Sequence, residues 1–445
     1  MKRVVIETMN LGMAFDKDET RIGLFKEDAP VINERLMERV LERENLRRAF
    51  RKVKRNKGSA GIDGMTVDDL TAFVNQHWPS IHQQLLEGRY RPQPVRQVEI
   101  PKPKGGVRKL GIPTVLDRLI QQALLQVLQA EWDKSFSHSS FGFRPGRSAH
   151  QAIRQAQDFI NEGYSWTVDM DLEKFFDRVN HDKLMSLIKR RTRDERVLKL
   201  INSYLKAGAL SGDVWVPASE GTPQGGPLSP LLANVLLDEF DKELEARGHK
   251  FVRYADDCNI YVQSARSGER VLASVARYLS NRLKLKVNSD KSAVDRPWNR
   301  TFLGLTCSRR GKHRLRKVSD ESIERFKYRI RQLTRRTRGR SIETIYKELS
   351  EYMRGWKAYF GVAEVKSPLL DLAKWVRRKL RCYLLKQWGR SGYRQLRKRG
   401  VDRWLAWNTA KSAHGPWRLS GSPALRYALP KQYFISVGIP ELGDR

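Results

Sequence analysis

Two short runs of strand-forming residues meet at a pair of aspartates, and this stretch constrains the fold more than any other. The runs are Phe251–Tyr254 and Asn259–Val262. Aromatic and β-branched residues favour strands while adjacent aspartates favour a tight turn, so we predict a β-hairpin with Asp256 and Asp257 at its tip. Two neighbouring carboxylates repel each other unless a divalent cation binds between them. The pair indicates either a metal site or a solvated turn, and a third carboxylate from another strand would favour the metal.

The charge balance points to a polyanionic partner. The chain of 445 residues carries 85 Lys and Arg against 50 Asp and Glu, a formal net charge of +35. Solubility requires far less, and the interspersed Arg, Trp and Tyr suit phosphate pairing and base stacking. A chain of this length is too long to fold around one hydrophobic core, so we expect roughly two to four domains.

The cysteines and the apolar segments indicate the compartment. Cys258, Cys307 and Cys382 are isolated from one another, which argues for a reducing compartment and against a disulfide framework or a zinc-binding module. No apolar run approaches the roughly eighteen residues of a membrane span, and the first residues are followed by charge rather than by the apolar core of a signal peptide. We therefore expect a cytoplasmic protein with no membrane partner.

A second predicted strand supplies the missing carboxylate. In the segment from Trp166 to Leu172, the residues Val168 and Met170 alternate with Asp169 and Asp171. Side chains alternate between the two faces of a strand, so the apolar residues face the core and both aspartates share the opposite face. Either aspartate could reach a metal ion, and the spacing alone does not choose between them.

Several loops carry groups suited to a nucleotide. A basic hairpin tip lies between two predicted strands, and it either clamps a triphosphate or is solvated. A rigid Gly- and Pro-rich turn spans Gly221–Pro230, and a strand is expected over Phe302–Thr306. The candidate side chains are Lys102, Lys104 and Arg108 at the basic hairpin, Arg144 and Arg147 in a glycine-punctuated loop, and Gln224 in the rigid turn.

The composition becomes strongly basic from Arg309 to Gly400. Apolar residues recur there at helical spacing in three segments, which predicts a small helical bundle. Past Gly400 we expect a small irregular module containing Trp404 and Trp407. The polar helix faces are expected to be free for phosphates, and they include Arg335, Arg336, Arg338, Arg377, Arg378 and Arg381.

The motifs, taken in order, resemble those of a reverse transcriptase. They are Asp171-Leu-Glu-Lys-Phe-Phe176-Asp, Gly221-Thr-Pro-Gln224-Gly-Gly-Pro-Leu-Ser-Pro and Tyr254-Ala-Asp256-Asp257. More narrowly, the chain is similar to the bacterial group II intron-encoded reverse transcriptase/maturases of the compact class C type, which lack an endonuclease domain. The likeness extends to Gly58–Gly64, the hairpin after Ile100, Phe141–Gly146, Phe302–Gly304 and the basic helices, and only the stretch before about Val31 is unmatched.

This resemblance implies a mixed α/β (α+β) fold, arranged as a right-hand polymerase with fingers, palm, helical thumb and a small C-terminal module. The boundaries that we expect are 1–46 for an N-terminal extension, 47–315 for fingers and palm, 316–392 for the thumb or maturase domain, and 393–445 for a DNA-binding-like region.

The resemblance also implies the site residues. In such enzymes the first catalytic aspartate precedes an aromatic ribose gate by five residues, which selects Asp171 over Asp169 and makes Phe176 the gate. Asp171, Asp256 and Asp257, with the carbonyl of Leu172, would hold two Mg²⁺ ions. By the same matching, the residues that contact the incoming dNTP are Lys102, Arg108, Arg144, Phe176 and Gln224, and Gly304 belongs to the primer grip.

The implied function is that of an RNA-directed DNA polymerase. It would copy intron RNA into cDNA during retrohoming, with an RNA template, a DNA primer, dNTPs and target DNA as partners, and would act as a maturase in splicing of its intron RNA. Two alternatives stay open: a free-standing or defence-associated reverse transcriptase without an intron, and a non-catalytic RNA-binding maturase. The sequence does not indicate which intron, which DNA target or which oligomeric state applies.

Overall fold

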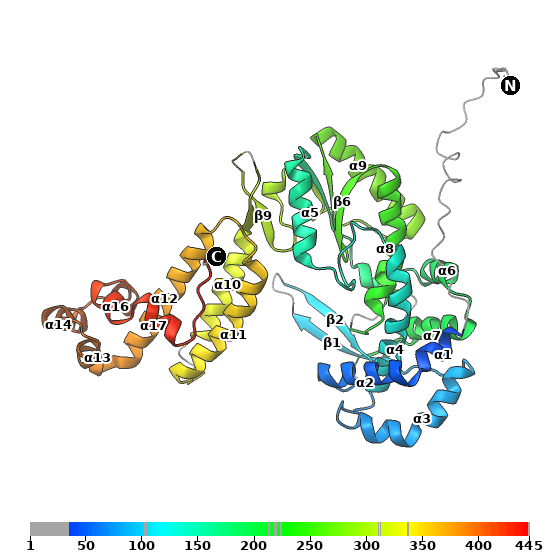
Figure 1. Ribbon diagram of the computed structural model, residues 1–445, viewed down its shortest axis with the longest axis horizontal. Coiled ribbons are helices and arrows are strands. Elements are labelled where there is room, and N and C mark those ends of the chain that lie inside the picture. The colour runs from blue at the N-terminus through cyan, green and yellow to red at the C-terminus, as the bar shows by residue number, and fades with distance from the viewer. Residues whose placement is uncertain are drawn as a thin grey trace, which may run out of the picture. The chain divides into compact units, whose positions relative to one another are not determined.

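The computed structural model describes residues 35–101, 105–211, 214–217, 220–222, 225–309, 311, 313–335 and 338–443. The chain folds into two compact units. Residues up to 136 and residues 180–235 make the first unit, while residues 137–179 and 236–445 make the second. Figure 1 shows helices and small sheets in each of them.

The first unit combines helices with a four-stranded sheet of order β2-β1-β4-β5. Strand β1 pairs antiparallel with β2 and parallel with β4. The strands are β1 (Val95–Pro101), β2 (Val107–Ile112), β4 (Ala209–Ser211) and β5 (Val214–Val216). The helices are α1 (Leu36–Leu41), α2 (Arg43–Asn56), α3 (Leu70–Leu86), α4 (Val115–Trp132), α6 (His181–Arg191), α7 (Glu195–Lys206) and the first part of α8 (Ser229–Ala246).

Helix α4 is largely buried in the first unit. Its apolar residues Leu119, Ile120 and Leu124 have almost no exposed surface. The helix begins after Thr114 because the hydroxyl of that residue accepts a hydrogen bond from the backbone N–H of Asp117 at 3.1 Å, which satisfies a donor that the first turn leaves free. Loops of the first unit pack against helix α4, as the close contacts of Gly61 with Thr114 and of Gly226 with Gln121 show.

The second unit contains a four-stranded antiparallel sheet of order β6-β7-β3-β8. Helices α5 (Ala149–Asn161) and α9 (Ala265–Tyr278) flank this sheet (Figure 1). On one face, Ala156 of α5 packs with Val252 and Tyr261. On the other, Gly268 of α9 lies so close that an added Cβ would be 2.4 Å from Val294. The strands are β3 (Trp166–Met170), β6 (Lys250–Tyr254), β7 (Asp257–Val262) and β8 (Ala293–Asp295).

The alternation predicted for β3 is confirmed. Val168, Met170 and Leu172 are buried, and Val168 faces Gly268 of α9. Because successive side chains alternate, Asp169 and Asp171 lie on the opposite face. The strand thus places both acids away from the apolar layer beneath α9.

The rest of the second unit is a β-hairpin followed by helices. Strands β9 (Leu305–Cys307) and β10 (Arg316–Val318) pair antiparallel. The three predicted apolar stripes meet in one core, which contains Phe326, Leu349 and Val376. No helix among the described residues has the apolar length to cross a membrane. The helices are α10 (Asp320–Leu333), α11 (Ile342–Phe360), α12 (Ser367–Trp388), α13 (Gly392–Lys398), α14 (Arg403–Lys411), α15 (Pro416–Leu419), α16 (Pro423–Ala428) and α17 (Lys431–Ser436).

Some arginines that were expected to be free for phosphates are engaged within the second unit. Nε of Arg381 donates to the carbonyl of Leu429 at 2.9 Å, and two others form ion pairs. Arg338 pairs with Glu348, with Nη1 and Oε2 2.7 Å apart, and Arg377 pairs with Glu441. The expectation was wrong for these two residues, because their acidic partners come from other parts of the chain. Arg336 lies outside the described residues.

Replacing Phe326 by Ala tests the core of the helical bundle. The ring is fully buried, with its centroid 4.7 Å from that of Trp356. We expect Phe326→Ala to lower the free energy of unfolding by about 3–5 kcal/mol, since the lost ring leaves a cavity. Urea denaturation followed by circular dichroism measures the change. Tyr328→Ala, on the same helix with its side chain 62% exposed, should change it by less than about 0.5 kcal/mol.

Candidate active site

The paired aspartates lie at the tip of the β6–β7 hairpin, as predicted. Tyr254 and Asp257 form the last cross-strand pair, so Ala255 and Asp256 make a two-residue turn. Ala255 has a φ of 59°. Tight hairpin turns require such a left-handed conformation at their first central position, because it matches the twist of the flanking strands.

Strand β3 brings Asp171 beside this tip. Met170 pairs with Cys258 of β7, and continuing the antiparallel register by one residue places Asp171 opposite Asp257. Directly opposed residues have Cβ atoms about 4.5–5.5 Å apart. Acids that are distant in the sequence therefore meet at one end of the sheet.

The surroundings of Asp257 disfavour its ionised form. Its pKa is raised to about 7, first because neighbouring protein atoms displace water from the carboxyl, although part of the residue reaches solvent, and then because Asp256, Asp169 and Asp171 add negative charge. The cation of Lys291 opposes this rise. A divalent cation among the carboxylates would relieve the repulsion.

Asp169 and Asp171 have different partners. The Nε and Nη2 atoms of Arg300 donate to one carboxylate oxygen of Asp169 at 2.9 and 2.6 Å. Burial raises the pKa of Asp169, and the guanidinium of Arg300 opposes that rise. Asp171 receives a contact of 3.1 Å from Nζ of Lys291, a side chain that is 66% exposed. A solvated ammonium leaves a carboxylate more easily than a bidentate guanidinium does, which favours Asp171 as the metal ligand.

The donor chemistry at this end of the sheet suits a hard divalent cation. Carboxylate oxygens are the ligands that Mg²⁺ prefers. Within the described ranges, no three His, Cys, Asp or Glu side chains are gathered closely enough to form a metal-binding cluster. Burial first, and then the charges of Asp256, Asp169 and Asp171, nevertheless raise the pKa of Asp257. A bound cation would remove the repulsion among these carboxylates.

The backbone on either side of Leu172 bonds to the segment around Val287. The N–H of Asn288 donates to the carbonyl of Asp171, and the N–H of Glu173 donates to the carbonyl of Lys286, both at 2.8 Å. These bonds join the carbonyl of Asp171 and the N–H of Glu173 to the segment around Val287, which forms an isolated antiparallel bridge with Leu172. Because successive carbonyls of an extended chain point to opposite sides, that of Leu172 points the other way.

Of the two neighbouring rings of Phe175 and Phe176, only that of Phe176 is accessible to solvent. Phe175 and Phe176 begin a 3-10 turn, Phe175–Asp177, with their ring centroids 5.1 Å apart and edge to face. Phe175 is buried in the core, whereas Phe176 is partly exposed. Of these two rings, that of Phe176 can meet a ligand.

The residues predicted to contact the dNTP differ in their exposure to solvent. Arg108 is exposed on β2 of the first unit. Arg144 is buried in the second unit, and its Nη1 donates to the carbonyl of Ser140 at 2.9 Å, so its guanidinium supports its own loop. Lys102 and Gln224 lie outside the described residues. The dNTP roles of all four stay predictions.

The turn that should hold Gln224 is anchored by its neighbours in the first unit. The imidazole Nε2 of His181 lies 2.6 Å from the carbonyl of Gly221. Gly225 has a φ of 133°, and an added Cβ would lie 2.6 Å from the carbonyl oxygen of Gly111 on β2. Glycine is required at Gly225 both for this conformation and for the close approach.

Gly304 lies in a tight turn rather than in the predicted strand. Phe302 and Leu305 exchange backbone hydrogen bonds of 2.8 and 3.0 Å, and the two residues between them have φ values of 51° and 79°. The expectation of a strand over residues 302–306 was therefore wrong, since β9 begins at Leu305. A Cβ at Gly304 would lie 2.9 Å from Oγ of Ser322 and 3.2 Å from the Phe360 ring, so the turn is pressed against α10 and α11.

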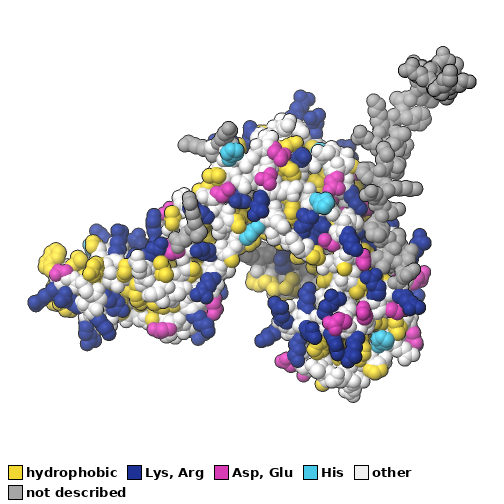
Figure 2. Space-filling model, in the orientation of Figure 1, with side chains coloured by type: hydrophobic (Ala, Val, Ile, Leu, Met, Phe, Trp, Pro, Cys, Tyr) yellow, Lys and Arg dark blue, Asp and Glu magenta, His cyan; other side chains and the backbone are white. Residues whose placement is uncertain are grey.

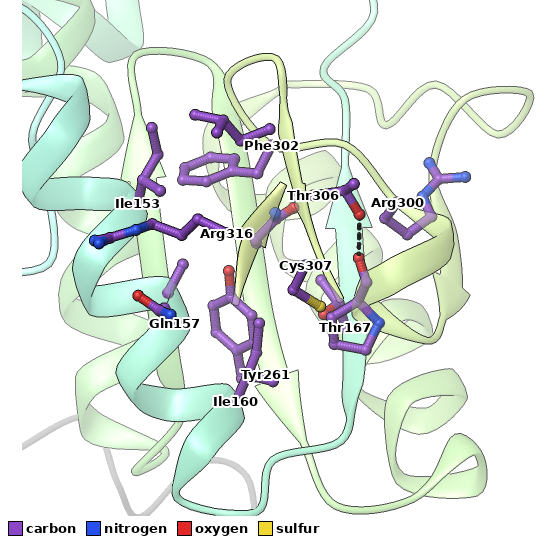
Figure 3. Close-up of a pocket in the computed structure, with 14 residues that line it drawn as sticks. Ile153, Gln157, Ile160, Thr167, Tyr261, Arg300, Phe302, Thr306, Cys307 and Arg316 are labelled. Atoms are coloured by element: carbon purple, nitrogen blue, oxygen red, sulfur yellow. Dashed lines mark hydrogen bonds between the residues drawn. The ribbon is translucent and has the colours of Figure 1, made fainter. Parts of the chain in front are cut away.

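A small cavity of about 50 Å³ lies on the sheet face that carries the acids. Figure 3 shows Gln157 of α5, Tyr261 of β7 and Cys307 of β9 around it. Among the described residues, the side-chain oxygens of Thr167 and Asn259 are buried there without a hydrogen-bond partner. Ordered water satisfies such atoms, and the volume suits a few waters rather than a nucleotide.

Charged residues next to the site were not expected from the sequence. They are Arg253, Asp241, Lys291 and Arg300. Arg253 interrupts an apolar strand, and helical spacing places Asp241 on the same face of α8 as the buried Leu237 and Leu244. A charge within a buried pattern was therefore the available signal. Lys291 and Arg300 lie in polar segments and carried no such signal.

Two protein families match the chain. "Reverse transcriptase (RNA-dependent DNA polymerase)" matches residues 100–307, and "Group II intron, maturase-specific domain" matches residues 323–404. Protein YkfC of Escherichia coli (strain K12) is 33% identical over 301 residues, which cover 59% of this chain and 79% of YkfC. The chain belongs to the group II intron reverse transcriptase/maturase family. The resemblance inferred from the motifs is thereby confirmed.

Other relatives of this family member carry the intron in their names. Group II intron-encoded protein LtrA of Lactococcus lactis subsp. cremoris is 36% identical over 55% of this chain and 40% of LtrA. An uncharacterized 91 kDa protein in the cob intron of Schizosaccharomyces pombe is 35% identical over 46% of this chain and 25% of that protein. The chain thus spans less than half of the length of these two relatives.

These matches confirm three expectations and leave others open. The mixed α/β fold class is confirmed, and the reverse transcriptase match supports the right-hand polymerase assignment and the assignment as an RNA-directed DNA polymerase. Reverse transcriptases as a family use divalent metal ions. The domain boundaries at 46, 315 and 392 stay predictions, as does the cytoplasmic location.

The different partners of Asp169 and Asp171 generate a prediction for this family member. If Asp171 is a metal ligand, Asp171→Asn should lower kcat for primer extension by at least roughly a thousandfold. Asp169→Asn should lower kcat by roughly 10- to 100-fold, since it loosens the Arg300 contact beside the site. Single-nucleotide incorporation at saturating dNTP measures both. Equal losses in the two variants, or the reverse order, would contradict the assignment of Asp171.

Proposed function

We propose that this chain is an RNA-directed DNA polymerase that copies intron RNA into cDNA during retrohoming and assists splicing of that RNA as a maturase. The observation that carries the first activity is the meeting of Asp171 with the Asp256–Asp257 turn inside the reverse transcriptase match. The maturase-specific match at residues 323–404 supports the second.

The carboxylates of Asp171, Asp256 and Asp257, together with the carbonyl of Leu172, are the proposed ligands of two Mg²⁺ ions. The chemistry that such ions supply is acidification of the primer 3′-hydroxyl and neutralisation of charge on the transferred phosphate. Strand β3 and the tip of the β6–β7 hairpin would bring these ligands to the same end of the sheet. Lys291, whose ammonium pairs with Asp171, would lower the net negative charge of the site.

Other residues of the chain select and hold the substrates. The ring of Phe176 would lie against the sugar and exclude a 2′-hydroxyl by its shape. Lys102, Arg108 and Arg144 would bind the triphosphate, since guanidinium and ammonium groups pair with phosphate oxygens. Gln224 would lie near the sugar and base of the dNTP. Gly304 would bring its turn against the primer.

The helices from α10 to α17 offer a surface for nucleic acid. Figure 2 shows Lys and Arg side chains spread over them. Exposed aromatic rings accompany these cations in residues 393–445: Trp404 is 72% exposed and Tyr427 is 64% exposed. Cations bind phosphates and aromatic rings stack on unpaired bases, which supports intron RNA and target DNA as the partners of this surface.

The double substitution Asp256→Ala, Asp257→Ala tests the polymerase activity. It should abolish extension of oligo(dT) on poly(rA) with dTTP and Mg²⁺, because the turn loses its metal-binding oxygens. RNA binding, measured by filter retention, should stay close to that of the wild-type chain. Asp320→Ala with Asp371→Ala removes the same charge from side chains that are 89% and 72% exposed, and it should leave extension intact.

Two outcomes would redirect the assignment. Extension that persists in the Asp256→Ala, Asp257→Ala chain would remove the catalytic role of the turn. A wild-type chain that promotes splicing of an intron transcript at low salt but extends no primer would be a non-catalytic maturase. A free-standing enzyme would extend primers but would not promote splicing of the intron transcript used in the test.

The exposed aromatic rings generate a separate prediction for the C-terminal region. Trp404→Ala with Tyr427→Ala should weaken binding of single-stranded DNA by at least roughly fivefold, since each stacked base contributes about 1–3 kcal/mol. Fluorescence anisotropy with a labelled oligonucleotide measures the change. Tyr328→Ala removes an equally exposed ring from α10 and should have a smaller effect. Unchanged affinity in the double variant would contradict a DNA-binding role for these rings.

A further inference from the structure

The catalytic turn has a backbone conformation that needs external support. Ala255, its first residue, has a φ of 59°. A left-handed conformation costs a residue with a Cβ atom roughly 1–2 kcal/mol. The turn also carries two neighbouring carboxylates, whose repulsion adds to that cost. Contacts from the rest of the second unit must therefore hold Ala255 in place.

A buried guanidinium makes one of these contacts. The Nη1 atom of Arg253 donates to the carbonyl of Ala255 at 2.9 Å. The same guanidinium is fixed by Asp241 of α8, with Nε and Oδ1 2.6 Å apart and Nη2 and Oδ2 2.5 Å apart. Its Nη2 also donates to Oγ of Ser140 at 2.8 Å. Arg253 is 1% exposed and Asp241 is fully buried.

A backbone segment braces the turn from a second direction. The N–H of Arg253 donates to the carbonyl of Ser139, and the N–H of Phe141 donates to the carbonyl of Arg253, both at 2.9 Å. The next residue is Gly142, where an added Cβ would lie 2.2 Å from the backbone nitrogen of Ala255. Neither backbone can yield easily at such a distance, so Gly142 marks direct contact between this segment and the turn.

We propose that Arg253, held by Asp241, is a positioning residue for Asp256 and Asp257, and that the Ser139–Gly142 segment is the second brace of the same turn. This role rests on the proposed polymerase function. Arg253 and Asp241 act through Ala255 and not on the substrate. A buried ion pair seldom adds net stability over an apolar pair of similar size, so orientation of the turn accounts for a charged pair at this place.

Replacing both members of the ion pair by apolar residues separates positioning from folding. Arg253→Met with Asp241→Leu removes the contact to Ala255 without leaving a buried charge unpaired. We expect an unchanged or raised melting temperature and a KM for dTTP close to that of the wild-type chain. The kcat for primer extension should fall roughly 10- to 100-fold, as for residues that orient metal ligands.

A second readout depends on the carboxylates themselves. Mn²⁺ binding to the full chain, titrated by electron paramagnetic resonance, should weaken in the double variant because the turn no longer holds its two acids in one orientation. The matched control is Arg247→Met with Glu243→Leu, which removes a partly buried ion pair from the same unit, outside the helices proposed to bind nucleic acid. The control should change neither Mn²⁺ binding nor kcat.

The glycine brace gives an independent test. Gly142→Ala forces a methyl group against the Ala255 backbone and should also lower kcat, whereas Gly355→Ala, with open space at its Cβ position, should not. If the ion-pair variant does not fold, Gly142→Ala decides alone. A kcat within about twofold of wild type in either folded variant overturns the positioning role. A wild-type chain that extends no primer instead contradicts the proposed function.

Discussion

Repulsion among the carboxylates at one end of the second-unit sheet is the constraint on which the rest of the site depends. Asp171 at the end of β3 faces Asp257 at the start of β7. Burial first, and then the charges of Asp256, Asp169 and Asp171, raise the pKa of Asp257 to about 7. The apolar faces of the same strands supply the stabilisation that holds these charges together, since Val168 and Met170 are fully buried on the side of α9. The sheet thus keeps a site that favours a cation.

The arginines near this site neutralise other acids instead of the proposed metal ligands. Arg300 binds Asp169, and Arg253 binds Asp241. A guanidinium paired directly with Asp171 or Asp257 would compete with a metal ion, because bidentate ion pairs between arginine and a carboxylate are strong. Of the proposed ligands, Asp171 pairs with the exposed ammonium of Lys291. This division explains how a highly basic chain preserves a local excess of negative charge.

Patterns that depend on neighbouring residues were predictable, and contacts between distant residues were not. The alternation in β3 and the stripes of the helical bundle follow from residue periodicity, and the structure contains both. Without the resemblance, the argument for Asp171 over Asp169 depends on Arg300, which is 131 residues away from Asp169. The ion pair of Arg377 needed Glu441, and the turn before β9 needs support from α10 and α11. Local pattern contains none of that information.

The turn at Leu303 and Gly304 is attached to the helical bundle by its carbonyl groups. That of Gly304 accepts from the N–H of Ser319 at 3.1 Å and from Oγ of Ser322 at 3.0 Å, and that of Leu303 accepts from the hydroxyl of Tyr359 at 3.0 Å. If this turn holds the primer as proposed, a tilt of α10 and α11 is converted into a shift of the primer terminus. The bundle then acts as a lever that sets the advance of the growing strand after each nucleotide.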